Sequence, residues 1–234
     1  MAKKSDNNDA KKARQKQKIV LVFGEDDNDR QAVSHLVKAL WPDVPTIRCL
    51  RAPLVLIKGR ANAEQRKSAT NISKVVAAQE VTHAVRAVFA HEDCDAVEPA
   101  HVVLSKQIED GLSLSGVPNP CAVTPAWEME AWWFMWPDQV KEQCRQWRRP
   151  QRDGTNVGLI QNAKETLRRE VRSTGKQTSR DYHESDGIDI AKRILDLGLV
   201  RDPKARSASF DMFVSRVDTI SGRSSQAKEI RKGS

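Results

Sequence analysis

The stretch from Val85 to Asp95 passes directly from apolar side chains to a group of acids. A short apolar run that ends in polar residues is typical of a buried β-strand at the point where it leaves a sheet. Because side chains alternate between the two faces of an extended chain, we expect Asp93 and Asp95 to point the same way. Two neighbouring carboxylates repel each other unless a positive charge lies between them, and a hard divalent cation is the usual solution. The stretch therefore predicts a metal site at the end of a strand.

Further apolar runs predict an α/β domain over residues 19–137, with a mainly parallel sheet flanked by helices. Ile19–Phe23, Thr46–Leu50 and Cys121–Val123 have the length of buried strands, and segments with helical apolar spacing separate them. After residue 137 the apolar spacing is helical throughout, which predicts a helical flank over 138–221 packed on the sheet. The helices of this flank are expected at 138–147, 161–173, 187–197 and 209–219.

Charge is distributed unevenly along the chain, whose net charge is +8 at pH 7. Residues 1–18 and 222–234 form basic tails, and the polar composition of the first tail is typical of a disordered segment. Residues 141–180 are also basic, with eleven Lys and Arg against four acids, so the rest of the body is correspondingly acidic. An acidic centre beside a basic flank suits a metal-dependent enzyme that acts on a polyanion.

The cysteines and the lengths of the apolar runs argue against two other classes of protein. The four cysteines are scattered without a CxxC pair, so neither a zinc ribbon nor a thioredoxin-type site is expected. The apolar runs are too short to span a bilayer, and no signal-peptide pattern opens the chain. We therefore expect a cytoplasmic protein without a membrane partner.

Two further acids are candidates for the predicted metal site. Glu25 follows the first predicted strand, and ligands of an open parallel sheet lie beyond the carboxyl ends of its strands. Glu130 lies in the aromatic segment from Trp127 to Trp136, with aromatic residues one helical turn away on both sides. A carboxylate on an aromatic face needs a partner, because burial of an unpaired charge is unfavourable. Glu128 is expected to be the more exposed acid of this segment.

These residues resemble the motifs of the TOPRIM domain, which topoisomerases, bacterial primases and OLD-family nucleases share. That family has a Glu after its first strand and an Asp-x-Asp after a later one, which correspond to Gly24-Glu25 and Asp93-Cys94-Asp95. The closest likeness is to small stand-alone RloB-like proteins of bacterial phage-defence loci, whose aromatic-rich E-x-W motif matches Glu130-Ala131-Trp132. The likeness covers roughly residues 19–219 and extends to Lys164, Tyr182 and Ser209-Phe210-Asp211-Met212-Phe213.

One position departs from the family pattern. The family has Gly directly after the Glu of the first strand, whereas here Asp26 follows Glu25 and the Gly precedes it. Whether Glu25, Asp26 or both face a metal is therefore left open at this point.

The resemblance implies a TOPRIM-type nuclease that hydrolyses phosphodiester bonds of nucleic acid in anti-phage defence. Glu25, Asp93 and Asp95 would hold Mg²⁺ or Mn²⁺, with Glu130 as a further ligand or directly behind the ligands. Lys164 would stabilise the charge that develops on the phosphate. DNA is expected more than RNA, and an ATPase partner protein is left open. The arginines expected to follow the strand backbone are Arg145, Arg148, Arg149, Arg168, Arg169 and Arg172.

Two other side chains near these motifs are weaker candidates for catalytic residues. Tyr182 is the only tyrosine of the chain, and we expect it to pack or to form a hydrogen bond rather than to act as a nucleophile. His91 adjoins the acids and is a candidate general base, although the five histidines show no metal-ligand spacing.

Two alternatives to a nuclease remain. A protein that kept the fold but lost the chemistry would bind nucleic acid or a partner within a defence complex without cleavage.

The segment Val20–Arg30 also resembles the first strand and acid pair of response-regulator receiver domains. A receiver has an Asp at the end of its third strand and a Lys at the end of its fifth. Here Asp93 comes late for that compact fold, and Thr124-Pro125 follows the Cys121–Val123 strand, so the nuclease is favoured.

Overall fold

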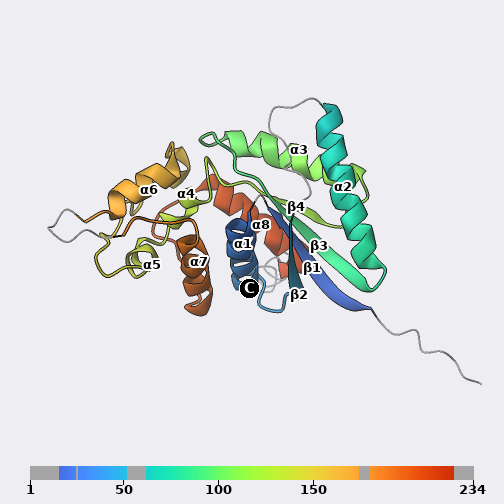
Figure 1. Ribbon diagram of the computed structural model, residues 1–234, viewed down its shortest axis with the longest axis horizontal. Coiled ribbons are helices and arrows are strands. Elements are labelled where there is room, and N and C mark those ends of the chain that lie inside the picture. The colour runs from blue at the N-terminus through green and yellow to red at the C-terminus, as the bar shows by residue number, and fades with distance from the viewer. Residues whose placement is uncertain (1–15, 25, 52–61, 174–179, 224–234) are drawn as a thin grey trace, which may run out of the picture.

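In the described part of the chain, four parallel strands form the sheet of this α/β protein, which confirms the predicted fold class. The computed structural model describes residues 16–24, 26–51, 62–173 and 180–223. The strands are β1 (Gln17–Gly24), β2 (Thr46–Arg51), β3 (His83–His91) and β4 (Pro120–Val123), in the spatial order β2-β1-β3-β4 (Figure 1). Because the chain adds β2 on one side of β1 and β3 on the other, the order reverses between β1 and β3. Open α/β sheets bind their ligands at such a reversal, beyond the carboxyl ends of the strands.

Helices separate the strands and continue after the sheet is complete. Those between strands are α1 (Asp27–Leu40), α2 (Asn62–Glu80) and α3 (Ala100–Leu114). After β4 the chain forms α4 (Glu130–Trp133), α5 (Pro137–Lys141), η1 (Val157–Leu159), α6 (Ala163–Val171), α7 (Asp186–Asp196) and α8 (Ala208–Ser221). Within the described ranges, no helix is both long enough and apolar enough to cross a membrane.

The two faces of the sheet carry separate apolar clusters. Val20, Val22 and Phe89 are fully buried on the face that α1 and α8 cover, and α7 packs against α1. Leu21 and Val88 are fully buried on the opposite face, against α2 and α3 (Figure 1). Burial on both faces explains why β1 and β3 read as continuous apolar runs rather than as alternating patterns.

Two helix predictions differ from the structure. The Trp-rich segment forms only the single turn α4, and the helix predicted over 138–147 ends at Lys141. The Lys141 ammonium donates to the backbone carbonyls of Cys144 (3.4 Å) and Arg145 (2.8 Å), which satisfies oxygens that a longer helix would have bonded. The sequence has a further apolar run, Leu54–Ile57, which lies outside the described residues.

Aromatic side chains join the segment after β4 to the last helix. The Trp132 and Phe213 rings stack with their centres 5.5 Å apart, and the Trp136 and Phe210 rings meet edge to face at 5.1 Å. These residues belong to the same apolar cluster as the α1 face of the sheet. The predicted helical flank therefore shares a core with the sheet.

The start of α8 holds the loops that follow β3 and β4. The Glu98 carboxylate, after β3, accepts hydrogen bonds from the Ser207 hydroxyl (2.8 Å) and the Ser209 backbone N–H (2.8 Å). The Ser209 hydroxyl in turn accepts from the Ala126 N–H (3.2 Å) and from the indole N–H of Trp132 (2.9 Å), both after β4. These hydrogen bonds anchor the loops after β3 and β4 to the N-terminus of α8.

Candidate functional site

The chain turns sharply after the end of β3, which changes the expected orientation of the two aspartates. β3 ends at His91, and Asp95 has a left-handed backbone (φ +43°). The Asp95 N–H donates to the Trp127 carbonyl (2.8 Å), so tertiary contact holds this turn. Neither residue continues the strand, so strand alternation does not determine how Asp93 and Asp95 point. Asp93 is partly buried and Asp95 is exposed.

His91 lies at the reversal point of the sheet, between two aspartates. Its buried imidazole places Nε2 3.3 Å from Asp93 Oδ1 and Nδ1 3.6 Å from Asp29 Oδ2. A Cβ at Gly24, the last residue of β1, would stand 3.1 Å from the Arg30 Cγ and 3.4 Å from the His91 Cβ, so the main constraint at this position comes from Arg30. Asp29 is in the first turn of α1 and was missed by sequence reasoning, because its spacing also fits an ordinary helix start.

The acids directly after β1 divide into one that caps a helix and one whose placement is not described. Asp26 is the N-cap of α1, and its side chain accepts the Asp29 backbone N–H (2.9 Å). Helix capping therefore accounts for Asp26 without a metal. Glu25 lies outside the described residues.

Glu130 is a buried carboxylate, with only 5% of its surface exposed. Burial raises its pKa to about 8, and the nearby charges of Asp93 and Glu128 add to this rise while Lys164 opposes it. Tyr182 hydrogen-bonds to the Glu130 side chain, and burial together with Glu130 raises the pKa of the tyrosine hydroxyl well above its ordinary value. This contact agrees with the expectation that Tyr182 packs or forms a hydrogen bond.

A cavity of about 10 Å³ lies beside Glu130, with Asp29, Tyr182 and Glu184 among its lining residues. This is about the space that one water molecule needs. Asp29, from α1, and Glu130, from α4, therefore face the same small space, although they are far apart in the sequence.

Lys164 brings a positive charge to these acids from the start of α6. Its ammonium is 2.9 Å from Glu184 Oε1, and its backbone N–H donates to Glu128 Oε2 (2.9 Å). Burial lowers the pKa of Lys164, but Glu184, Glu130 and Glu128 outweigh that effect and leave the pKa raised. Burial also raises the pKa of Glu128, with Lys164 opposing and Asp93 adding to the rise. The structure thus brings Asp93, Glu130 and Lys164 of the sequence prediction into one electrostatically coupled cluster.

The donor chemistry of this cluster fits a hard divalent cation. Glu128 and Glu130 lie near other carboxylates that raise their pKa, and a bound cation would stabilise their charged forms. Their oxygen donors suit Mg²⁺ or Mn²⁺. Across the described ranges, however, no three His, Cys, Asp or Glu side chains stand together as the ligands of a metal ion would. The described side chains therefore show no complete set of metal ligands.

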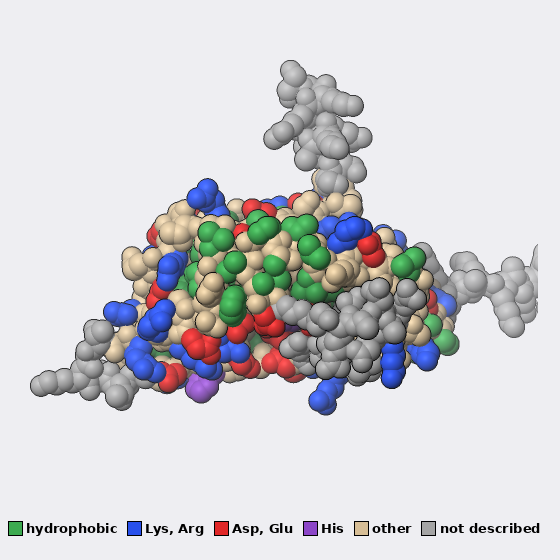
Figure 2. All heavy atoms as spheres, turned by 90° about the horizontal axis from the view of Figure 1, so that it is seen from above, with side chains coloured by type: hydrophobic (Ala, Val, Ile, Leu, Met, Phe, Trp, Pro, Cys, Tyr) green, Lys and Arg blue, Asp and Glu red, His purple; other side chains and the backbone are tan. Residues whose placement is uncertain are grey.

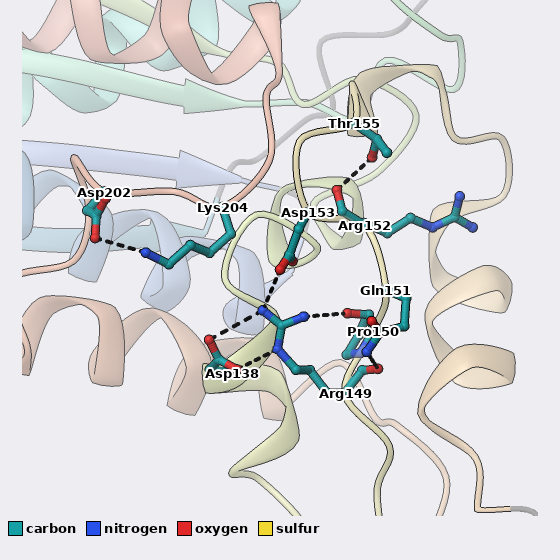
Figure 3. A network of polar contacts seen from close by, with 9 residues as sticks. All are labelled: Asp138, Arg149, Pro150, Gln151, Arg152, Asp153, Thr155, Asp202 and Lys204. Atoms are coloured by element: carbon teal, nitrogen blue, oxygen red, sulfur yellow. Dashed lines mark hydrogen bonds and ion pairs between the residues drawn. The ribbon is translucent and has the colours of Figure 1, made fainter.

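The six arginines of the predicted nucleic-acid surface differ in their contacts. Arg149 pairs with Asp138 and Asp153 (Figure 3), Arg172 pairs with Asp181, and Arg168 pairs with Glu165 while donating to the Tyr182 carbonyl. Among the residues that the structure describes, no carboxylate pairs with Arg145, Arg148 or Arg169. In Figure 2, basic side chains gather at the end of the molecule that carries α5 and α6, next to a group of acidic side chains.

Comparison with known proteins adds no relative: no family model, no curated protein and no solved structure matches the chain.

Proposed function

We propose that this protein is a metal-dependent nuclease of the TOPRIM type that hydrolyses phosphodiester bonds in nucleic acid. The observation that carries the proposal is the buried Glu130, whose pKa is raised to about 8 next to Asp93 and Lys164, beyond the carboxyl ends of a parallel sheet. Strongly perturbed acids that gather at such an edge are typical of catalytic sites. With the resemblance of the motifs, we place the activity in the cytoplasm, in anti-phage defence, on DNA more than on RNA.

In this proposal each residue of the cluster has a distinct task. Asp93 and Glu130, with Asp95 and Glu25, would supply carboxylate oxygens for Mg²⁺ or Mn²⁺. Once bound, such an ion polarises a phosphate oxygen and lowers the pKa of a water ligand.

The neighbouring side chains fix these groups and meet the substrate. His91 holds the Asp93 carboxylate in place from one side, with Asp29 on the other side of its ring. Lys164 is charged at neutral pH, since its acidic neighbours raise its pKa in spite of burial, and it offers that charge to the phosphate.

A nuclease assay with matched variants tests the proposal. Wild type is incubated with Mg²⁺ or Mn²⁺ and with labelled single- and double-stranded DNA and RNA, beside Asp93→Asn and Lys164→Gln. We expect cleavage by wild type, none by Asp93→Asn and a reduced rate for Lys164→Gln. Asp110→Asn is the control, because Asp110 is exposed on α3 and pairs with Lys106. Cleavage by Asp93→Asn at the wild-type rate contradicts the proposal.

A second candidate is a nucleic-acid-binding or partner-binding subunit of a defence complex that has no nuclease activity. The observation in its favour is that the described acids do not complete a three-ligand metal site. This candidate predicts no cleavage by wild type with either metal, and binding of nucleic acid that Asp93→Asn leaves unchanged.

A further inference from the structure

A hollow of about 530 Å³ opens beside α6, apart from the cluster of acids. Its lining consists of Arg148, Arg149, Pro150, Gln151, Arg152 and Glu170. Pockets of about 300–1,000 Å³ hold ligands of nucleotide size. Its three guanidinium groups face three acids, because Glu170 pairs with Arg152 while Asp138 and Asp153 pair with Arg149. Within the described residues, the charge of Arg148 is therefore the one of the three that no carboxylate balances, and this charge favours an anionic ligand.

Two of the arginines are fixed in place by acids. Arg149 donates to Asp138 (2.5 Å) and to Asp153 (2.9 Å), and Figure 3 shows its guanidinium between them. The Arg152 side chain extends toward α6, where it pairs with Glu170, and its guanidinium lies 5.7 Å from the centre of the Phe134 ring. These contacts hold the wall of the hollow rigid, which lowers the entropy lost when a ligand binds.

Arg148 is the arginine of the hollow that remains available to a ligand. It is exposed, and its Nε donates to the backbone carbonyl of Glu170 (3.3 Å). In the described part of the chain, its two terminal NH₂ groups have no hydrogen-bond acceptor. A guanidinium oriented through Nε presents both of these groups to a phosphate in a bidentate geometry.

The hollow lies at the opposite end of α6 from Lys164. Residues 164 and 170 are separated by about 9 Å along a helix axis. Arg168 and Arg169 lie between them on the same helix. We therefore place one strand along α6, with its cleaved phosphate near Lys164 and a nearby phosphate in the hollow.

We propose that this hollow binds a backbone phosphate of single-stranded nucleic acid through Arg148, next to the phosphate that is cleaved. The inference rests on the proposed function, since it assigns the strand that the acid cluster would act on. The hollow has room for a whole nucleotide, which a flexible single strand can place there, whereas a duplex meets it with its outer phosphates alone.

Binding measured without catalysis tests the hollow independently. Fluorescence anisotropy of a labelled single-stranded DNA oligonucleotide is followed in EDTA over a salt series. We expect Arg148→Gln to weaken binding about fivefold and to lower the slope of log K against log salt by about 0.7. Gln151→Glu keeps every arginine and adds a negative charge to the lining, so it is expected to weaken binding as well. Arg201→Gln is the control, because Arg201 pairs with Asp218 outside the hollow.

The outcomes separate this inference from the nuclease proposal. If both Arg148→Gln and Gln151→Glu bind with wild-type affinity and melt as wild type does, the hollow is not a binding site for the strand. This conclusion holds even if wild type cleaves DNA with Mg²⁺. Weakened binding by both variants supports the hollow as a phosphate-binding site, even if no metal produces cleavage. An equal loss of affinity for duplex and single strand overturns the assignment to a single strand, and absence of binding by wild type overturns the whole inference.

Discussion

Replacing Glu130 by glutamine tests the candidate site through stability rather than catalysis. The pKa of Glu130 rises from its ordinary value of 4.5 to about 8 in the folded protein, mainly through burial. At about 1.4 kcal/mol per pKa unit, the difference corresponds to about 5 kcal/mol. Relaxation around the charge makes this an upper limit. Glutamine has the same shape, does not titrate, and offers an oxygen to the Tyr182 hydroxyl.

The sign of the effect follows from the raised pKa. The contribution of Glu130 to stability is fully present below pH 4.5 and is lost as the pH rises through about 8. At pH 9 in EDTA, Glu130→Gln is therefore expected to unfold with a larger free energy than wild type, by up to about 5 kcal/mol. At pH 4.5 the two proteins should be nearly equal.

Urea denaturation followed by the fluorescence of the six tryptophans, in EDTA between pH 4.5 and 9, measures this difference. Glu142→Gln is the control, because Glu142 is exposed and pairs with Arg193 at the surface. A difference between Glu130→Gln and wild type that does not change with pH refutes the reasoning. Mg²⁺ should then stabilise wild type and leave Glu130→Gln unchanged, and equal stabilisation of both excludes Glu130 as a ligand.

Three further substitutions test buried positions around the site: Gly158, Ser209 and His101. Gly158→Ala should destabilise the fold by about 1–3 kcal/mol in urea denaturation, because a Cβ there would stand 2.0 Å from the Glu98 carboxyl carbon. Gly111→Ala is its matched control, since its Cβ has a nearest neighbour at 3.8 Å and alanine favours the helix, so stability should not fall. Ser209→Ala should cost about 2–4 kcal/mol by leaving two buried N–H donors without their acceptor, and a thermal melt at the wild-type midpoint contradicts this. Burial lowers the pKa of His101, so the unfolded chain takes up the proton first and stability should decline as the pH falls below 6.5. His101→Gln should remove that part of the decline.

The strands β1 and β3 were predictable because most of their side chains are buried on both faces, whereas β2 is only partly buried. Ile19–Phe23 lies within β1, and the apolar part of the Val85 stretch lies within β3, which ends one residue beyond Ala90. Continuous apolar runs of this length have few other stable environments in an α/β protein. The acids that follow them therefore lie beyond the carboxyl ends of a parallel sheet, as the sequence indicates.

The details of the site depend on contacts between distant segments and were not predictable. Asp95 and Trp127 both have positive φ, and a hydrogen bond between the two loops holds the Asp95 turn. Local sequence gives little signal for a backbone conformation that a tertiary partner imposes. Asp29 was missed for a related reason, because only the fold shows that His91 lies beside it.

Because Ser207 and Ser209 are synthesised after the residues that they contact, these contacts can form only late in synthesis. The ribosome makes Glu98 about a hundred residues before the serines that bind it, and Trp132 also precedes its Ser209 acceptor. Until α8 emerges, the loops that carry Asp93 and Glu130 lack these anchors. Contacts of such long sequence separation form late in folding. A nascent or truncated chain would therefore hold the acids without their final geometry, so any activity of the site would begin only after the last helix has been translated.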